Sequence, residues 1–261
     1  MTERPLITLL TDFGLEDTYV GVMKGVIKRI CTDAHLIDLT HTIPPQNVTA
    51  AAFALLDAYG HFPRGTIHLA VVDPGVGGDR RGIAVRTAAG YFVGPDNGLF
   101  APIFAISPVI EAVNLDNPQY WFTPEPSKTF HGRDIFAPAA AYLAGGLPLT
   151  ILGSAILAEN IVTLPLHSPR MVAGEIIGEV RSIDRFGNLI TNIPAAMVED
   201  RSWCAVVADT VIPSRTSYGE VSPGDYLALV DSNGWIEIAV NSGNAREKSG
   251  ANIGTAVKIR L

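Results

Sequence analysis

The sequence of 261 residues has little cysteine and little positive charge. Its two cysteines, Cys31 and Cys204, lie far apart in segments predicted to be strand or helix interior, so neither a disulfide framework nor a cysteine metal site is expected. Nineteen basic residues against twenty-six acidic ones leave a net charge of −7. Such a chain has no positive field to attract nucleic acid or anionic lipid. We therefore expect neither a nucleic-acid partner nor a membrane partner.

Apolar runs long enough to cross a membrane are missing as well. The longest uncharged stretch, residues 135–158, is interrupted by Pro138, by Gly145 and Gly146, and by Pro148, which leaves pieces too short to span a bilayer. The N-terminus runs straight into a strand pattern, without the long apolar region of a secretory signal. We expect a cytoplasmic protein.

Several signature motifs of common enzyme classes are absent from the sequence. It has no H-x-x-x-H pair, no C-x-x-C and no calcium-loop pattern, so no metal site is predicted. A G-x-S-x-G elbow and a phosphate-binding G-x-x-x-x-G-K loop are missing too, which disfavours a serine hydrolase and a P-loop nucleotidase. We expect no metal and no bound cofactor.

The first part of the chain alternates strand and helix patterns. Strands are predicted at residues 6–11, 35–39 and 66–72, and helices at 17–30 and 48–59. Alternation of this kind is typical of an α/β domain whose mostly parallel sheet is covered on both faces. Residues 82–87 and 91–94 then predict a hairpin. Residues 135–143 resume the helical spacing.

The last third of the chain predicts strands and no long amphipathic helix. Short β-type runs at 175–183, 203–207, 226–230 and 235–240 are separated by turn sequences, the pattern of a small all-β barrel or sandwich. A proline-bracketed linker covers residues 164–169, within a boundary region of 162–172. We therefore expect an α/β domain over 1–165 and a smaller β-barrel domain over 170–261.

Two acidic residues follow predicted strands of the first domain. Asp12 comes after the first strand, where ligands commonly bind in open α/β sheets and where a carboxylate can hold a ribose diol, although it can also simply cap the next helix. Asp73 follows the third strand, and the proline and glycines after it allow a tight turn that brings Asp73 towards Arg80. The hairpin that follows excludes a dinucleotide-type phosphate loop, which requires a helix there. An incidental surface ion pair is the alternative.

Three further clusters of polar residues lie in predicted loops. His131 precedes the apolar helix and is suited to neutral-pH proton transfer, but a structural histidine is equally compatible with this position; Asp134 is better explained as a helix-start residue. Asp184 and Asn188 flank Phe186, a ring that could stack on a flat ligand, in a segment that also fits an ordinary turn. Ser232 lies in a similar polar turn.

Taken together, these segments resemble the S-adenosyl-L-methionine hydroxide adenosyltransferases, the hydrolase branch of the superfamily that contains the fluorinase and chlorinase. The motifs that carry the resemblance occur in family order over nearly the whole chain: Thr11-Asp12-Phe13-Gly14, Val72-Asp73-Pro74-Gly75-Val76-Gly77, Phe130-His131-Gly132-Arg133-Asp134 and Asp184-Arg185-Phe186-Gly187-Asn188. The resemblance implies an N-terminal α/β domain, a C-terminal β-barrel, and a homotrimer whose active sites lie between one subunit's first domain and a neighbour's second.

The same resemblance implies roles for individual residues. Asp73, Arg80 and His131 match the set that holds and activates a water at ribose C5′, and Asp12 matches the residue that binds the ribose hydroxyls. The remaining matches are methionine-contacting positions, at Asp17, Asp184 and Ser232, and nucleoside-contacting positions, at Phe186 and Asn188. The sequence departs from the fluorinase at Asn233, where that enzyme has an arginine, and at Ile190, where it has a tryptophan.

The chemistry of a sulfonium substrate fits these residues. A sulfonium leaves as a neutral thioether, so displacement at C5′ requires an aligned, deprotonatable water but neither an acid nor a metal at the leaving atom. We predict hydrolysis of S-adenosyl-L-methionine to adenosine and L-methionine. The alternatives are a halogenase of the same superfamily, which would need a drier site, and a non-catalytic protein that binds S-adenosylmethionine or a nucleoside. A metal-dependent phosphohydrolase is less favoured.

Overall fold

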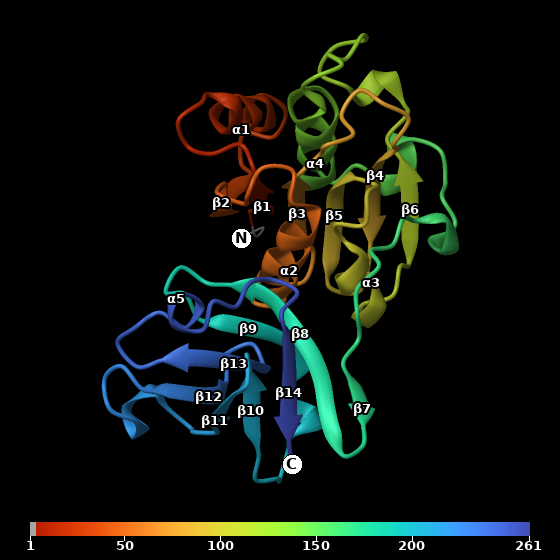
Figure 1. Cartoon of the computed structure of the whole chain (residues 1–261). Helices are drawn as coiled ribbons and strands as arrows, with labels where there is room; N and C mark the ends of the chain where they lie inside the picture. Colours follow the sequence, from red (N-terminus) through yellow and green to blue (C-terminus); the bar gives the residue numbers. More distant parts are fainter. Residues whose placement is uncertain (1–3) are drawn as a thin grey trace. The chain divides into compact units, whose positions relative to one another are not determined.

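The computed structural model describes residues 4–261 and divides the chain between Leu164 and Pro165 into two compact units (Figure 1). The first unit contains a six-stranded sheet in the order β2-β1-β3-β5-β4-β6. Its strands are β1 (Leu6–Thr11), β2 (His35–Thr40), β3 (Thr66–Val71), β4 (Gly82–Arg86), β5 (Gly90–Pro95) and β6 (Glu111–Asn114). Strands β2, β1, β3 and β5 run parallel, whereas β4 is antiparallel to both neighbours. The predicted mostly parallel sheet and the β4–β5 hairpin are confirmed.

Helices cover both faces of this sheet. The α-helices are α1 (Tyr19–Ile30), α2 (Val48–Tyr59), α3 (Ala101–Ile106) and α4 (Ala137–Ala144), and the shorter helical turns are η1 (Pro118–Tyr120), η2 (Gly132–Phe136), η3 (Leu149–Leu152) and η4 (Ala158–Asn160). Because successive strand residues face opposite sides, Ile7 and Leu9 of β1 pack into a core with α1 and α4, while Leu10 packs with α2 and α3.

The local sequence accounts for the two long helices of this unit. Helix α1 buries Val20, Met23, Val26 and Ile27, a spacing that places all four side chains on one helical face. Helix α2 begins at a cap: the Asn47 side-chain oxygen accepts a hydrogen bond from the Ala50 N–H at 2.9 Å, which satisfies one of the free donors of the first turn.

The predicted helix over residues 135–143 is α4 together with the preceding η2, which is a π-helical turn. Pro138 has no N–H to donate to the carbonyl of Asp134, four residues earlier. That carbonyl instead accepts a hydrogen bond from the N–H of Phe122 at 2.9 Å. The wider turn follows directly after His131, and turns of this kind often occur at functional sites.

The second unit is an antiparallel sheet that curls into a nearly closed barrel. Its strands are β7 (Arg170–Val172), β8 (Glu175–Ile183), β9 (Leu189–Pro194), β10 (Cys204–Val207), β11 (Thr210–Pro213), β12 (Tyr226–Val230), β13 (Trp235–Val240) and β14 (Ala256–Arg260), and its helical turns are η5 (Ala195–Met197), η6 (Tyr218–Glu220) and α5 (Ala245–Ser249). The main path runs β11-β10-β14-β8-β9-β13-β12, with β7 paired to β8. A bridge between Ser214 and Ala228 joins the two ends of this path. The predicted all-β second half is confirmed as a barrel.

The 3-10 turns η1, η3 and η4 of the first unit were not predicted, and neither were α3 and β6. Both are short, and α3 carries Pro102 in its first turn, so neither shows a helical or strand periodicity over enough residues to be recognised. Within the described range 4–261, no helix has both the length and the apolarity needed to cross a membrane.

Candidate active site

A pocket of about 380 Å³ lies at the carboxyl ends of β1 and β3. Asp12 and Phe13 follow β1, Val71 ends β3, and Asp73 follows it; the lining is completed by Tyr19, by Pro45 and Gln46, by Pro74 and Val76, and by residues 129–132. The chain passes from β1 to β2 on one side and then to β3 on the other. Ligands of open α/β sheets bind at such a reversal of strand order, so the fold places Asp12 and Asp73 at the expected edge.

Arg80 joins Asp73 and His131, two polar side chains that line this pocket. Its Nε donates to Oδ1 of Asp73 at 2.8 Å, and its Nη2 donates to Oδ2 of the same carboxylate. The same Nη2 lies 2.7 Å from Nδ1 of His131. The Asp73 side chain is only 5% exposed and that of Arg80 13%, so water screens this ion pair less than it screens a surface pair. The three residues form one connected group.

The contact with Arg80 fixes the protonation of His131. A guanidinium is always charged and has no acceptor, so Nδ1 of His131 accepts the hydrogen bond and the proton of the neutral ring is on Nε2. Burial lowers the pKa of His131, and the positive charge of Arg80 lowers it further against the opposing carboxylates of Asp73 and Asp134. His131 is therefore neutral at neutral pH, with a donor at Nε2.

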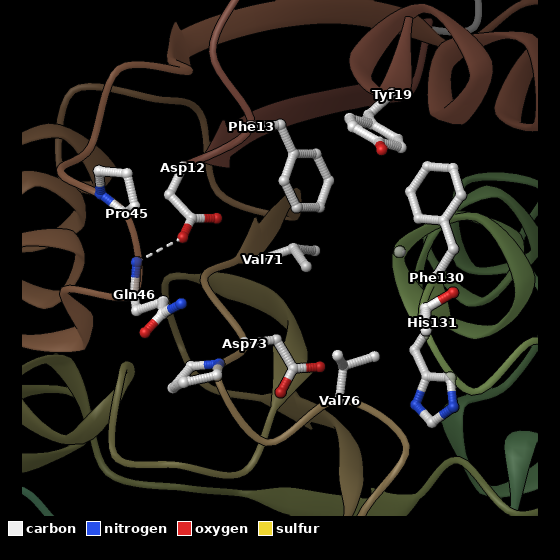
Figure 2. A pocket seen from close by; sticks show the side chains of 13 residues that line it. Asp12, Phe13, Tyr19, Pro45, Gln46, Val71, Asp73, Val76, Phe130 and His131 are labelled. Carbon is white, nitrogen blue, oxygen red and sulfur yellow. Dashed lines mark hydrogen bonds between the residues drawn. The ribbon is translucent and has the colours of Figure 1, made fainter. Parts of the chain in front are cut away.

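The segment before α2 fixes the Asp12 carboxylate by a hydrogen bond. Its Oδ2 accepts a hydrogen bond from the backbone N–H of Gln46 at 2.7 Å (Figure 2). Gln46 has a φ of 65°, a left-handed conformation that is uncommon for a residue with a side chain and is often found at functional sites. Since Oδ2 is engaged, Oδ1 is the Asp12 oxygen left for a ligand. Sequence reasoning missed Gln46 because nothing in its residue type indicates a positive φ.

A buried histidine ties the Asp12 turn to the same segment. Nδ1 of His41 lies 2.8 Å from Oγ1 of Thr11, and the carbonyl of His41 accepts a hydrogen bond from the Gly14 N–H at 2.7 Å. These contacts flank Asp12 on both sides along the chain. Asp12 therefore lies in a turn that hydrogen bonds fix on both sides.

Gly77 brings the loop that carries Asp73 and Arg80 against the loop that carries His131. It has a φ of 75°, and a Cβ at this position would lie 2.1 Å from the backbone oxygen of Lys128. Only a residue without a side chain allows so close an approach of two backbones. The glycines after β3, predicted to form a tight turn, therefore also set the distance between the two halves of the site.

The structure brings together Asp12, Asp73, Arg80 and His131, but it does not place Asp17 with them. Asp17 is exposed in the turn before α1 and does not line the pocket. Asp134 is fully buried and accepts hydrogen bonds from the Ser127 N–H at 2.8 Å and from Arg133. It fixes the loop before His131 and does not face the pocket.

The remaining predicted residues belong to the second unit. Asp184 Oδ1 accepts hydrogen bonds from the N–H groups of Phe186 and Asn188, and its Oδ2 accepts one from Nδ2 of Asn188. Phe186 on this turn is 73% exposed, which is unusual for a large aromatic residue. Ser232 is exposed in the turn between β12 and β13. Of the residues from 4 to 261, no three or more His, Cys, Asp or Glu side chains form a group that could hold a metal ion.

The fold and the pocket define a two-part protein: an α/β unit that bears an Asp-Arg-His site at its strand ends, followed by an antiparallel barrel. Residues 7–153 match the family model of the SAM hydroxide adenosyltransferase N-terminal domain, and residues 178–258 match that of the C-terminal domain. The chain belongs to the SAM hydroxide adenosyltransferase family.

Similar proteins of known sequence span the whole chain. A Thermus thermophilus protein named (R)-S-adenosyl-L-methionine hydrolase is 41% identical, over 97% of this chain and 98% of that protein. A Salinispora tropica protein of the same name is 39% identical over 99% of both. A fluorinase of Nocardia brasiliensis is 26% identical over 99% of this chain and 97% of its own.

Solved structures resemble the chain to the same extent. The crystal structure of a conserved protein from Thermotoga maritima has a TM-score of 0.92 and 39% identity, and it covers 98% of this chain and 100% of that one. A conserved hypothetical protein from Thermus thermophilus has a TM-score of 0.82 and 40% identity with the same coverage.

Proposed function

We propose that this protein hydrolyses S-adenosyl-L-methionine to adenosine and L-methionine. The observation that carries the proposal is the connected group of Asp73, Arg80 and His131. Asp73 and His131 of this group line a pocket that also contains the Asp12 carboxylate, whose Oδ1 is left for a ligand. This arrangement offers a ribose-binding oxygen and a water-binding group within one cavity. The hydrolase names of relatives that are 41% and 39% identical support the same reaction.

In the proposed reaction, a water attacks C5′ of the ribose in line with the C5′–S bond. The new C5′–O bond forms while the C5′–S electron pair passes to sulfur, so the positive sulfonium becomes a neutral thioether. The water must lose one proton overall. Alignment of the two reacting atoms supplies much of the rate, up to about 7–11 kcal/mol in well-oriented cases.

We assign the proton to Asp73. A carboxylate has about four lone-pair positions, and the Arg80 contacts occupy part of them, so an acceptor position remains for the water. Nδ1 of His131 is already engaged by Arg80, and its Nε2–H can only donate. The Nε2–H of His131 therefore donates to a lone pair of the water and orients it. Arg80 holds Asp73 and His131 in place. Oδ1 of Asp12 accepts a hydrogen bond from a ribose hydroxyl.

The proposal also includes the residues outside this pocket. Asp17, Asp184 and Ser232 hold the methionine part, and Phe186 and Asn188 contact the nucleoside, in a cytoplasmic homotrimer whose sites combine residues of neighbouring subunits. The exposed Phe186 ring on a turn stiffened by Asp184 supports such a contact. The reaction requires no metal, because the leaving group departs neutral.

The test is an assay of the purified protein with S-adenosyl-L-methionine, followed by chromatography of the products. Because the sulfonium sulfur is a stereocentre and the relatives are named for an (R) substrate, the two sulfonium epimers are assayed separately. We expect equimolar adenosine and methionine, at the same rate with and without a chelator. A halogenated nucleoside formed in the presence of chloride or fluoride would support the halogenase alternative, and binding without any product would support a non-catalytic binding protein.

A further inference from the structure

Three aromatic side chains form one wall of the active-site pocket. Phe13 follows β1, Tyr19 begins α1, and Phe130 immediately precedes His131 (Figure 2). Their ring centroids lie 5.2 to 6.0 Å apart, and their planes meet at 58° to 83°. We refer to these three rings as the aromatic wall. Nothing in the water-activating group described above uses them.

The aromatic wall is supported by the core behind it and open towards the pocket. Phe13 and Phe130 pack against the core that β1 forms with α1 and α4. A Cβ on Gly132 would lie 3.3 Å from the ring of Phe130 and 3.5 Å from that of Phe13, so the missing side chain lets both rings close over the start of η2. Tyr19, in contrast, is 47% exposed. If the three aromatic residues served only stability, we would expect Tyr19 to be buried as well.

Two groups of the proposed substrate are candidates for this surface, the flat adenine and the positive sulfonium. The rings meet one another at steep angles, so no two of them form the parallel faces that would enclose a base. Phe130 is also the chain neighbour of His131, and the aromatic wall therefore adjoins the reacting end of the pocket. The group bonded to the attacked carbon is the sulfonium.

The electrostatics of the pocket favour the same assignment. Aromatic faces attract cations through their quadrupole, and three such rings line this part of the pocket. Asp73 is paired with Arg80, whereas Asp12 accepts only the backbone N–H of Gln46 and keeps its negative charge and a free Oδ1. A cation in this pocket therefore meets both the Asp12 carboxylate and the three rings, and both favour it over a neutral group.

We infer that the aromatic wall of Phe13, Tyr19 and Phe130 binds the sulfonium and makes the pocket selective for the cationic substrate over the neutral thioether that lacks its methyl group. This inference rests on the proposed hydrolase function. It predicts a specific kinetic effect. Because the sulfur loses its charge as the C5′–S bond breaks, the rings stabilise the bound substrate at least as much as the transition state, so their removal raises KM and does not lower kcat.

The test compares three ligands in wild type and in the single variants Phe13→Leu, Tyr19→Leu and Phe130→Leu. KM and kcat are measured for S-adenosyl-L-methionine, and inhibition constants for S-adenosylhomocysteine and adenosine. The first inhibitor has a neutral thioether in place of the sulfonium, and the second has no sulfur. In the variants we expect KM to rise by about two- to thirtyfold, the range of a cation–π contact, while kcat does not fall and both inhibition constants stay within about twofold. Phe122→Leu, which changes a phenylalanine outside the pocket, serves as the matched control and keeps the wild-type constants.

A second measurement keeps the ring shape. Phe130 is replaced by phenylalanines with one, two and three ring fluorines, which weaken the quadrupole stepwise. We expect KM for the sulfonium to rise with each fluorine while the inhibition constant of the neutral thioether does not change. If all three ligands weaken together, the wall stacks on adenine and the inference is wrong; if KM does not change in any variant, it is wrong as well. Failure of the proposed function itself would show differently, as wild-type protein that releases no adenosine.

Discussion

Nη2 of Arg80 lies 2.7 Å from Nδ1 of His131 and also donates to Oδ2 of Asp73, so one guanidinium connects an imidazole on one loop with a carboxylate on another. The planar fork of arginine can make both contacts at once, whereas the ammonium of lysine cannot reproduce this geometry. The arrangement fixes which nitrogen of His131 carries a proton, and this has a measurable consequence.

We predict that His131 titrates below the usual histidine range and has its proton on Nε2. Burial lowers its pKa, and the Arg80 charge lowers it further, so the ring stays neutral at pH values where a free imidazole becomes charged. In Arg80→Gln this charge is lost while Asp73 and Asp134 remain, so the pKa of His131 rises. Nitrogen-15 and carbon-13 NMR of the histidine rings measures both the tautomer and the titration midpoint.

The matched control for this titration is Arg86→Gln, which removes a surface arginine paired with Glu111. We expect it to leave the His131 midpoint unchanged. A proton on Nδ1 in the wild type, or the same midpoint in Arg80→Gln and wild type, would contradict the assigned hydrogen bond.

Loss of the proton acceptor should reduce turnover but leave substrate binding largely unchanged. In Asp73→Asn the side chain keeps its shape but accepts a proton poorly, so we expect kcat to fall by about 10²- to 10⁴-fold, the usual contribution of a general base. His131→Ala loses the orienting donor and should also fall steeply. In both variants the dissociation constant of S-adenosyl-L-methionine should stay within about tenfold, or about 1.4 kcal/mol, as measured by calorimetry. Unchanged adenosine release from Asp73→Asn would refute its role.

The close approach at Gly77 gives a structural prediction about activity. In Gly77→Ala, the new Cβ would lie 2.1 Å from the Lys128 oxygen, and the residue would be held at a φ of 75°. The two loops must move apart, which separates Arg80 from His131. We expect a loss of stability of about 1–3 kcal/mol and a fall in kcat/KM of about tenfold or more, because small misplacements at a reacting centre cost much rate.

Gly60→Ala is the matched control for Gly77→Ala. Gly60 ends α2 with a φ of −67° and has free space around its Cβ position, so alanine fits without strain and should be neutral or slightly stabilising. Chemical denaturation and steady-state kinetics of the two variants separate the effects. Wild-type kcat/KM in Gly77→Ala would show that the spacing of the loops does not matter for the reaction.

The sequence allowed the main elements of both units to be predicted because their signals are local. Alternation and helical spacing in β1, α1 and α2 follow from which face of each element is buried. Helix α3 and strand β6 are too short for such periodicity. The π-helical turn before α4 depends on a contact between Phe122 and Asp134, which lie twelve residues apart, and no window of sequence contains that information.

The candidate site was partly predictable for the same reason. Asp12 and Asp73 follow strands, and a strand end is visible in the sequence, so their convergence could be anticipated. The role of Gln46 depends on its backbone N–H and its left-handed φ, which are properties of the folded chain and not of the residue type. The aromatic wall was hidden for another reason, since phenylalanine and tyrosine next to an apolar helix are expected to belong to the core.

A buried histidine remote from the reaction makes stability depend on pH. His68 of β3 is 1% exposed, stacks on Phe92 at 5.1 Å between centroids, and has Nδ1 2.8 Å from Oγ1 of Thr8. Burial lowers its pKa to about 4. The unfolded chain therefore binds a proton near pH 6.5, before the folded protein does. Stability from this group is complete above about pH 6.5 and is lost as the pH falls towards 4, by about 3 kcal/mol.

The double variant Thr8→Val with His68→Phe isolates this effect, because it replaces the pair with apolar groups that do not titrate and leaves no polar atom without its partner. Urea unfolding is measured between about pH 4 and about pH 7 for wild type, the double variant and His61→Gln, a change at an exposed histidine. Carboxylates contribute equally to the pH dependence of stability in all three proteins. A difference between the slopes of unfolding free energy against pH is therefore due to His68. We expect wild type and His61→Gln to lose stability in parallel and the double variant to lose about 3 kcal/mol less. Three identical slopes would mean that His68 is protonated in the folded protein as easily as in the unfolded chain.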